Sequence, residues 1–318
     1  MMDWRTELER RVRGELVRDA PLATRTAVRV GGPADLLVRP ADPEALGALL
    51  RAVRELGLPL HVLGGGANTL VSDLGFRGVV VRLPPDFPGE SAAGDTLVLS
   101  AGGATTRLWS RGHAMGLTGM EFIAGIPGSL GGCVAMNAGT KLGEMKDVVT
   151  RVELATAEGA GFVAAAALDF GYRRARLPAG AVVTRVECRL KPADAAGLAE
   201  SERRMLEDRE KRLRTQPYDK PTFGSTFTNP PGDHAGRLIE AAGLKGHRIG
   251  NAVWSPVHAN FVSNLGGATA ADVLALMRLA RARVKERFGV DLETEVRLVG
   301  EFAPEEIAGL AHAGQMDR

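Results

Sequence analysis

Apolar side chains recur at helical spacing in two segments of the chain. In the first, Asp42 and Pro43 precede the apolar stripe and Gly57 follows it, which is the pattern of an N-cap, a first-turn proline and a C-terminal stop. In the second, Thr269 and Asp272 match a capping box and Gly289 ends the pattern. The two stripes, which predict amphipathic helices, are Leu46, Leu49, Leu50, Val53 and Leu56, and Val273, Leu274, Leu276, Met277, Ala280, Val284 and Phe288.

Short apolar runs bounded by glycine, proline or aspartate predict β-strands at 60–63, 79–83 and 97–99, and 104–115 fits a short connecting helix. Near the C-terminus, residues 292–299 alternate in polarity and predict a further strand. One face would carry Leu292, Thr294, Val296 and Leu298, and the other Glu293, Glu295, Arg297 and Val299. The mixture of elements indicates an α+β protein.

A strongly charged segment, 195–214, has few apolar residues and predicts an exposed linking helix. The Gln216-Pro217 and Lys220-Pro221 pairs then disfavour helix, because proline and the residue before it both resist helical backbone. A second domain is therefore expected from about residue 216.

Composition narrows the class of protein. A chain of 318 residues exceeds a single ordinary core and predicts more than one domain. A formal net charge of +2 argues against a dedicated nucleic-acid binder. The two cysteines, Cys133 and Cys188, lack C-x-x-C spacing, and no Cys/His/Asp cluster has metal spacing, so neither a disulfide framework nor a metal is expected. The charged N-terminus and the absence of a long apolar run predict a cytoplasmic protein that is neither exported nor embedded in a membrane.

The 40 glycines gather in clusters, notably at 31–32, 64–66 and 125–139. At 64–69 a predicted strand leads into Gly-Gly-Gly-Ala-Asn-Thr, whose bare amide groups could approach a pyrophosphate. A tight turn in an ordinary sheet is the alternative, and the segment lacks the G-x-G-x-x-G dinucleotide pattern. The glycine-dense run at 119–139 is longer than most folds require.

Three segments taken in order resemble the successive FAD-contacting segments of the UDP-N-acetylenolpyruvoylglucosamine reductase family: 29–35 (Arg-Val-Gly-Gly-Pro-Ala-Asp), 63–68 and 125–139. The resemblance covers about residues 21 to 300. It implies an α+β fold, with an FAD-binding domain of the vanillyl-alcohol-oxidase (PCMH) type in two subdomains over 21–192, divided near residue 83. A linking helix at 193–215 and a C-terminal α+β substrate-binding domain at 216–302 would follow, and the strand near 292–299 is a candidate to pack back toward the FAD domain.

The resemblance implies that these segments contact FAD, with the glycine amides on its pyrophosphate and the turn at 125–128 near the isoalloxazine ring. For Asn68 and Asn137 the alternative is a loop-capping role, in which the side chain bonds to backbone. The implied FAD contacts are Arg29, Gly31, Gly32, Gly64, Gly65, Gly66, Ala67, Asn68, Thr69, Gly125, Ile126, Pro127, Gly128, Gly131, Gly132, Asn137, Ala138 and Gly139.

The activity implied is the NADPH-dependent, FAD-mediated reduction of UDP-N-acetylglucosamine enolpyruvate to UDP-N-acetylmuramate in peptidoglycan precursor synthesis. Such a reaction needs a hydride donor, a group that stabilises charge toward the carboxylate, and an acid that protonates carbon. FAD, with NADPH as reductant, would supply the hydride. The expected partner is the small-molecule substrate alone, with no nucleic acid and no membrane, and a monomer is expected.

Three residues match the family's catalytic positions. Arg173 would engage the carboxylate through its planar fork, although a solvated basic turn is the alternative. Ser225, in a Gly-Ser…Asn-Pro segment, would donate the proton, and a structural turn serine is its alternative. Glu295 would help Arg173 to stabilise the enolic intermediate, or would be an exposed strand residue paired with Arg297. The implied substrate contacts are Tyr172, Asn229, His258 and Asn260.

The chain departs from the family pattern at Ala175, where relatives commonly carry serine, and at Thr228, where they often carry lysine or arginine. The interval from Arg173 to Ser225 is short, so the chain resembles the class that lacks an inserted tyrosine loop. Two other hypotheses remain: an FAD oxidase of the same fold, and a catalytically silent flavin-binding or nucleotide-binding regulator. The three catalytic matches together favour the reductase.

Overall fold

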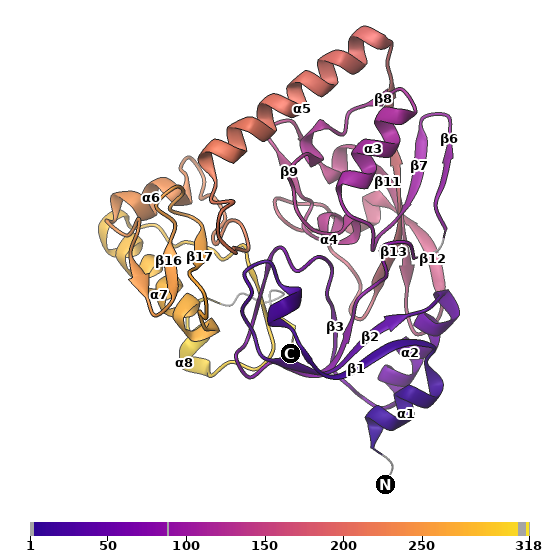
Figure 1. Ribbon diagram of the computed structural model, residues 1–318, viewed down its shortest axis with the longest axis horizontal. Helices are drawn as coiled ribbons and strands as arrows, with labels where there is room; N and C mark the ends of the chain where they lie inside the picture. Colours follow the sequence, from indigo (N-terminus) through magenta and orange to yellow (C-terminus); the bar gives the residue numbers. More distant parts are fainter. Residues whose placement is uncertain (1–2, 88, 311–315, 318) are drawn as a thin grey trace. The chain divides into compact units, whose positions relative to one another are not determined.

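The computed structural model describes residues 3–87, 89–310 and 316–317 (Figure 1). These residues form two compact units. The first comprises the described residues of Met1–Val17, Leu36–Gly65 and Val80–Arg212, and the second those of Arg18–Asp35, Gly66–Val79 and Leu213–Arg318. Among the described residues, no helix combines the length and apolar character that crossing a membrane requires.

The first unit is built around a five-stranded antiparallel sheet in the order β12-β11-β13-β7-β6. Helix α4 packs against β13, and the core beneath includes Leu130, Val134, Val152 and Val186. The strands of this sheet are β6 (Ser91–Ala93), β7 (Thr96–Ser100), β11 (Val149–Ala155), β12 (Ala160–Ala164) and β13 (Val182–Arg189). The helices of the unit are α1 (Trp4–Arg11), α2 (Pro43–Glu55), α3 (Thr106–Ala114), α4 (Leu130–Ala135) and α5 (Ala195–Thr215), with α5 continuing past the unit's last residue.

A second sheet has the strand order β1-β2-β5-β3. Its strands are β1 (Gly14–Pro21), β2 (Pro33–Pro40), β3 (Leu60–Val62) and β5 (Phe76–Val81). Three of the five boundaries between the two units fall within β1, β2 and β5. Two-stranded ribbons complete the first unit: β8 (Leu117–Thr118) with β14 (Lys191–Pro192), and β9 (Gly139–Thr140) with β10 (Gly143–Glu144).

The second unit joins two early segments of the chain to its C-terminal part. Val28, Val30 and Leu70 from those early segments lie in the same hydrophobic core as Trp254 and Val273. In addition, β18 (Arg297–Val299) pairs in parallel with β4 (Thr69–Val71), the strand that follows the first glycine loop. The second unit thus includes 21–35 and 66–79, which the family resemblance assigned to the FAD-binding domain. Its other elements are β15 (Arg248–Ile249), β16 (Ala252–Trp254), β17 (Val262–Asn264), β19 (Met316–Asp317), α6 (Ala235–Ala241), α7 (Ala270–Phe288) and α8 (Pro304–Ile307).

Both predicted amphipathic helices are confirmed. Asp42 caps α2 by accepting a 2.8 Å hydrogen bond from the Ala45 N–H. Thr269 and Asp272 form the capping box of α7, and Gly289 ends that helix in the left-handed conformation. One position of the first stripe was predicted wrongly: Leu56 is 39% exposed, because it follows the last helical turn instead of facing the core.

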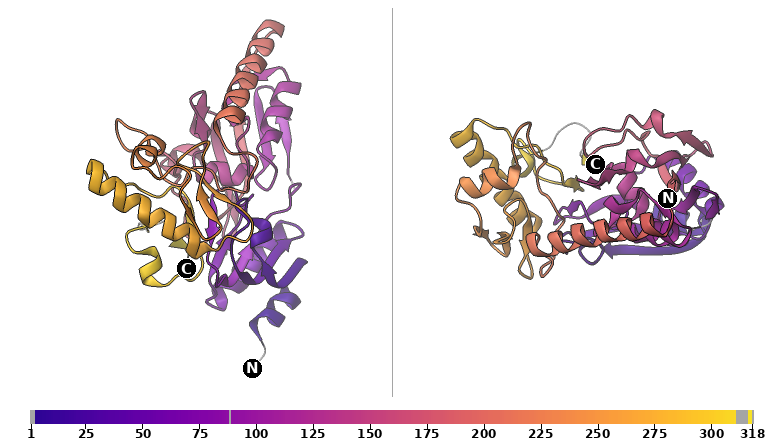
Figure 2. Two further views of the ribbon diagram at one scale, coloured as in Figure 1. Left: turned by 60° about the vertical axis from the view of Figure 1, so that its left-hand side comes forward. Right: turned by 90° about the horizontal axis from the view of Figure 1, so that it is seen from above.

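The charged segment forms α5, which Figure 2 shows as one unbroken helix. The residues it buries are polar, Ser201 and Asp208. Ser201 donates a hydrogen bond to the buried Glu121 carboxylate, and Asp208 lies 3.7 Å from the Lys141 ammonium. Polar contacts therefore attach the helix to the first unit, consistent with its few apolar residues.

The predicted C-terminal strand is shorter than its sequence pattern. The predicted core face is confirmed, since Leu292, Thr294, Val296 and Leu298 are buried, but Val299, which was predicted to lie on the opposite face, is buried as well. Regular pairing is confined to Arg297–Val299, however, and Thr294 forms only an isolated bridge to Phe227. The burial pattern follows from the hydrophobic core on which this segment packs. A regular strand also needs a neighbouring strand that continues its hydrogen bonds.

Candidate active site

The two glycine loops of the first unit lie directly against each other. A Cβ atom added to Gly65 would meet the Cα atom of Gly128 at 2.5 Å, and one added to Gly64 would meet the Ser129 hydroxyl oxygen at 2.5 Å. Real Cβ contacts are essentially never so short. These two glycines are thus required by backbone-to-backbone packing of the loops.

The packed loops leave several main-chain donors without acceptors. Within the described part of the chain, the N–H groups of Gly64, Gly65, Gly125, Gly128 and Ser129 donate no hydrogen bond to another residue. Ser129 is only 7% exposed, and a buried donor without an acceptor is costly unless a ligand satisfies it. The arrangement fits an anion such as a pyrophosphate.

Thr105 fixes the direction of one of these donors, the Ser129 N–H. Its N–H donates to the Gly128 carbonyl at 3.3 Å, and its hydroxyl donates to the Ile126 carbonyl at 2.5 Å. In a trans peptide the C=O and the next N–H point in opposite directions, so the Ser129 N–H points away from Thr105. Sequence analysis gave Thr105 no role in the loop.

Glycines 31, 32 and 66 of the predicted FAD segments lie in the second unit. Gly66 has φ +65°, and a Cβ there would meet the Arg25 carbonyl oxygen at 2.2 Å. A Cβ on Gly31 would meet the Val71 Cβ at 2.5 Å, and one on Gly32 would meet the Asp73 carbonyl oxygen at 2.2 Å. Their packing neighbours in the described chain therefore account for these glycines without a ligand.

Arg29, a predicted FAD contact, has the left-handed φ of 57°, which is uncommon outside glycine. The buried Asn264 supports this turn, since its side-chain amide donates to the Val28 carbonyl at 2.9 Å and to the Arg29 carbonyl at 3.3 Å. Strained backbone of this kind concentrates at functional sites. Asn264 was not singled out by the sequence pattern.

Arg173 lies at the tip of a two-residue turn in the first unit. The main chains of Gly171 and Arg174 exchange hydrogen bonds of 3.0 and 3.3 Å, and Arg173 has φ 57°. Its guanidinium donates to the Gly139 carbonyl at 3.2 Å and lies 5.2 Å from the centre of the Tyr172 ring. Tyr172 itself is 51% exposed. The turn thus presents the arginine and the tyrosine side by side.

The buried side chain of Asn137 holds this turn in place by hydrogen bonds. Its side chain is fully buried and donates to the Gly171 carbonyl at 3.0 Å and to the Glu144 carboxylate at 2.8 Å. Its side-chain oxygen accepts from the Lys146 N–H at 3.0 Å. These contacts favour the loop-capping alternative for Asn137. Asn68 likewise donates to a backbone carbonyl, that of Glu295, at 3.0 Å.

In the second unit, the segments of Ser225 and Glu295 are neighbours. Ser225 forms an isolated bridge with Phe261, and Phe227 forms one with Thr294. Between these bridges the Glu295 N–H donates to the Thr226 carbonyl at 2.8 Å. The structure therefore brings two of the three predicted catalytic segments together.

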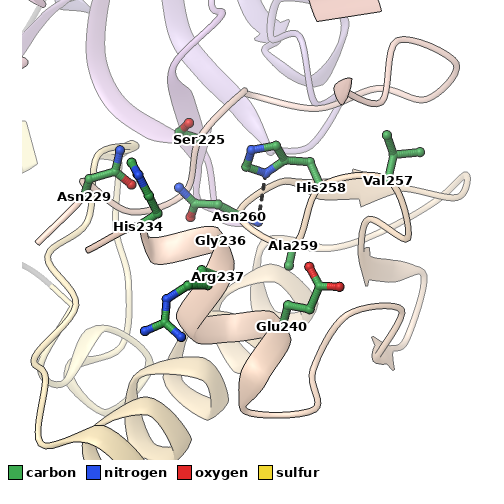
Figure 3. Close-up of a pocket in the computed structure, with 10 residues that line it drawn as sticks. All are labelled: Ser225, Asn229, His234, Gly236, Arg237, Glu240, Val257, His258, Ala259 and Asn260. Atoms are coloured by element: carbon green, nitrogen blue, oxygen red, sulfur yellow. Dashed lines mark hydrogen bonds between the residues drawn. The ribbon is translucent and has the colours of Figure 1, made fainter. Parts of the chain in front are cut away.

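A cavity of about 350 Å³ lies beside Ser225 (Figure 3). It unites Ser225 with three of the four predicted substrate contacts, Asn229, His258 and Asn260. The remaining lining residues are His234, Gly236, Arg237, Glu240, Val257 and Ala259. Tyr172 lies in the other unit.

His258 is held in one tautomer. Its Nδ1 accepts a 3.2 Å hydrogen bond from the Asn260 N–H, so the proton of the neutral ring is assigned to Nε2. Burial lowers the pKa of His258 below 6.5, and the nearby Lys245 ammonium lowers it further, whereas a main-chain hydrogen bond and the Glu240 carboxylate oppose the shift. His258 therefore lines the cavity as a neutral hydrogen-bond donor.

Arg237 and His234 were missed by the sequence pattern. Arg237 forms a bidentate pair with Asp233, which lies four residues earlier and just before α6, with 2.6 Å between Nε and one carboxylate oxygen. This pair lowers the pKa of Asp233 to about 2. The Asp-x-x-x-Arg spacing could have indicated this ion pair in the sequence, but such pairs are common on exposed helix surfaces and do not mark a site.

The two cysteines are free and buried in the first unit, where burial raises the pKa of each thiol to about 12. They are therefore neutral at physiological pH. Among the residues that the structure describes, no group of three or more His, Cys, Asp or Glu side chains could hold a metal ion.

Two family models match the chain. One describes an FAD binding domain and matches residues 34–163, and the other describes the C-terminal domain of UDP-N-acetylenolpyruvoylglucosamine reductase and matches residues 216–299. The second match contains the whole cavity and both Ser225 and Glu295.

Full-length relatives agree with these matches. A UDP-N-acetylenolpyruvoylglucosamine reductase of Anaeromyxobacter dehalogenans strain 2CP-C is 75% identical over 97% of this chain and 93% of its own length. One of Myxococcus xanthus is 52% identical over 91% of this chain and 93% of its own length. The crystal structure of the Thermus caldophilus enzyme superposes with a TM-score of 0.77 at 40% identity, covering 90% of this chain and 98% of that one.

Proposed function

The chain belongs to the UDP-N-acetylenolpyruvoylglucosamine reductase family, and from this premise we propose how its own residues carry the family's reaction. It is an FAD-containing oxidoreductase that uses NADPH to reduce UDP-N-acetylglucosamine enolpyruvate to UDP-N-acetylmuramate in peptidoglycan precursor synthesis. The identity of 75% over nearly the whole chain carries this conclusion. It also favours the reductase over an oxidase of the same fold and over a silent regulator.

The fold is the α+β arrangement expected from the sequence: an FAD-binding domain of the vanillyl-alcohol-oxidase type followed by the reductase C-terminal domain. We place the FAD domain at 21–192, the linking helix at 193–215 and the substrate domain at 216–302. The match of the C-terminal family model to residues 216–299 supports the last range.

We assign the FAD pyrophosphate to the donors of the packed glycine loops. When bound, FAD takes a hydride from NADPH and supplies it to the substrate. The chain provides the N–H groups of Gly64, Gly65, Gly128 and Ser129, which lack acceptors among the described residues. The remaining predicted contacts, including Arg29, stay proposals that flavin-content measurements on variants can test.

The side chains of the protein then have two tasks: to stabilise negative charge on the substrate and to supply a proton. Arg173 stabilises the negative charge that develops toward the substrate carboxylate, because its planar fork matches a carboxylate. Ser225 donates its hydroxyl proton to the carbon next to the one that receives the hydride. Glu295 acts with Arg173 on the enolic intermediate. The adjacency of the Ser225 and Glu295 segments supports their joint action.

We propose that the cavity beside Ser225 receives part of the UDP-sugar, with Asn229 and His258 among its contacts. Arg237 also lines this cavity, with its guanidinium paired to Asp233. Tyr172, beside Arg173, is proposed as a further substrate contact. The chain is proposed to act as a cytoplasmic monomer, without a nucleic-acid or membrane partner.

Steady-state assay of the purified holoprotein tests the proposed function. NADPH consumption should depend on the enolpyruvyl UDP-sugar, and mass spectrometry should show a product two hydrogens heavier than the substrate. Substrate-independent NADPH oxidation with no such product would reject the proposal.

A further inference from the structure

Asn260 is almost completely buried, at 3% exposure, yet it borders the cavity that contains Ser225 (Figure 3). Each of its four polar groups has a partner within the chain. Its main-chain oxygen accepts from the Thr226 N–H at 2.8 Å, and its main-chain N–H donates to His258 Nδ1 at 3.2 Å.

The side-chain amide of Asn260 bonds to both main-chain groups of Phe227. Asn260 Oδ1 accepts from the Phe227 N–H at 3.0 Å, and Nδ2 donates to the Phe227 carbonyl at 2.8 Å. An amide side chain has the donor and acceptor arrangement of a peptide group, so it replaces a neighbouring strand at this residue. The 226–227 backbone, which directly follows Ser225, is thereby held on one side by Asn260.

The opposite partner of this backbone is the other catalytic segment, since the Thr226 carbonyl accepts from the Glu295 N–H at 2.8 Å. The sequence pattern expected Asn260 to contact substrate. Its amide is instead engaged with buried backbone, and breaking those bonds would leave buried polar groups unsatisfied.

We propose that Asn260 is a positioning residue for the proton-transfer step: it fixes the backbone that carries Ser225 and, through its N–H, the ring of His258. This inference rests on the proposed function of Ser225. Because proton transfer to carbon depends steeply on geometry, a displacement of about 1 Å can cost on the order of 10²-fold in rate.

The test is the Asn260→Asp variant, which keeps the volume and the acceptor for the Phe227 N–H but sets a carboxylate oxygen against the Phe227 carbonyl. Stopped-flow absorbance under nitrogen gives the rate of flavin reduction by NADPH, and then the limiting rate and the substrate dissociation constant of reoxidation by the enolpyruvyl UDP-sugar. We expect a limiting reoxidation rate lowered by about 10- to 100-fold. Reduction by NADPH and the dissociation constant should stay within about threefold of the parent values, because neither depends on proton transfer.

Asn251→Asp is the matched control. Asn251 lies in the same unit and is partly buried, and its side chain accepts from Arg248, outside the cavity. It should give parent rates in both half-reactions. If Asn260→Asp does not yield folded holoprotein, Asn260→Ser, which retains a small polar side chain, takes its place in the same measurement.

A raised dissociation constant with an unchanged limiting rate would make Asn260 a substrate contact and overturn the inference. Equal losses in both half-reactions, loss of fold in both variants, or no change in either half-reaction would also overturn it. These outcomes differ from failure of the proposed function, in which the parent protein itself would not be reoxidised by the substrate.

Discussion

The main-chain N–H of Glu295 donates a hydrogen bond of 2.8 Å to the carbonyl oxygen of Thr226, the residue that follows Ser225. Two residues from segments far apart in the sequence are thereby held on adjacent backbones. The pairing supports the proposal that Ser225 and Glu295 act in one step.

Ser225→Ala should affect only the second half-reaction. Loss of a positioned general acid typically costs about 10²–10⁴ in rate. Flavin reduction by NADPH should proceed at the parent rate, whereas reoxidation by the enolpyruvyl UDP-sugar should slow at least about a hundredfold. Rapid-mixing absorbance of the flavin measures both steps in one preparation. Equal slowing of the two steps would indicate that Ser225 supports the structure only.

Arg173→Lys should greatly reduce turnover although it keeps the positive charge, because an ammonium cannot make the bidentate contact of a guanidinium. We expect a loss on the order of 10²-fold in kcat, similar to removal of one charge-stabilising donor. Arg176→Lys is the matched control, since Arg176 is an exposed arginine near the same turn, paired with Asp169 at 3.4 Å. Parent-like turnover of the Arg173 variant would remove this arginine from the catalytic step.

Gly65→Ala should lose FAD, because its methyl group would lie 2.5 Å from the Gly128 Cα atom and force the two loops apart. Gly161→Ala is the control: a Cβ there meets nothing within 4 Å. Flavin absorbance per mole of purified protein measures the outcome. Stoichiometric FAD in the Gly65 variant would show that the cofactor does not depend on the packing of these loops.

His258 predicts a specific dependence of stability on pH. Its pKa is below 6.5 in the folded protein, so as the pH falls through 6.5 the unfolded chain binds a proton that the folded chain does not. The free energy of unfolding should therefore fall on acidification, and His258→Gln should lose less stability between about pH 7.5 and about pH 5.5. Denaturant unfolding at a series of pH values measures the difference. Parallel profiles for parent and variant would contradict the burial of an uncharged ring.

Local signals in the sequence were sufficient for the helices. The caps at Asp42 and Thr269 and the stop at Gly289 act within one turn of the helix, so the bounds of α2 and α7 follow from neighbouring residues. Long-range pairing could not be predicted in the same way. The parallel pairing of β4 with β18 joins Leu70 to Leu298, and neither segment alone specifies that partner.

In the candidate site, too, local motifs could be predicted from the sequence whereas contacts between distant residues could not. Motifs identified Ser225, Asn229 and His258, which line one cavity, whereas Arg237 carried only the pattern of an ordinary surface ion pair. The glycine clusters indicated close backbone approach, but not that Gly65 would approach Gly128. The roles of Asn137 and Asn260 depend on which atoms their amides contact, and this became visible only in the folded chain.

The central claim, that this chain transfers reducing equivalents from NADPH through FAD to an enolpyruvyl UDP-sugar, is tested most directly by single-turnover absorbance of the parent protein under nitrogen. NADPH should bleach the flavin band, and one equivalent of UDP-N-acetylglucosamine enolpyruvate should then restore the oxidised spectrum and yield UDP-N-acetylmuramate. A folded, flavin-loaded protein whose spectrum stays bleached after this addition would contradict the claim.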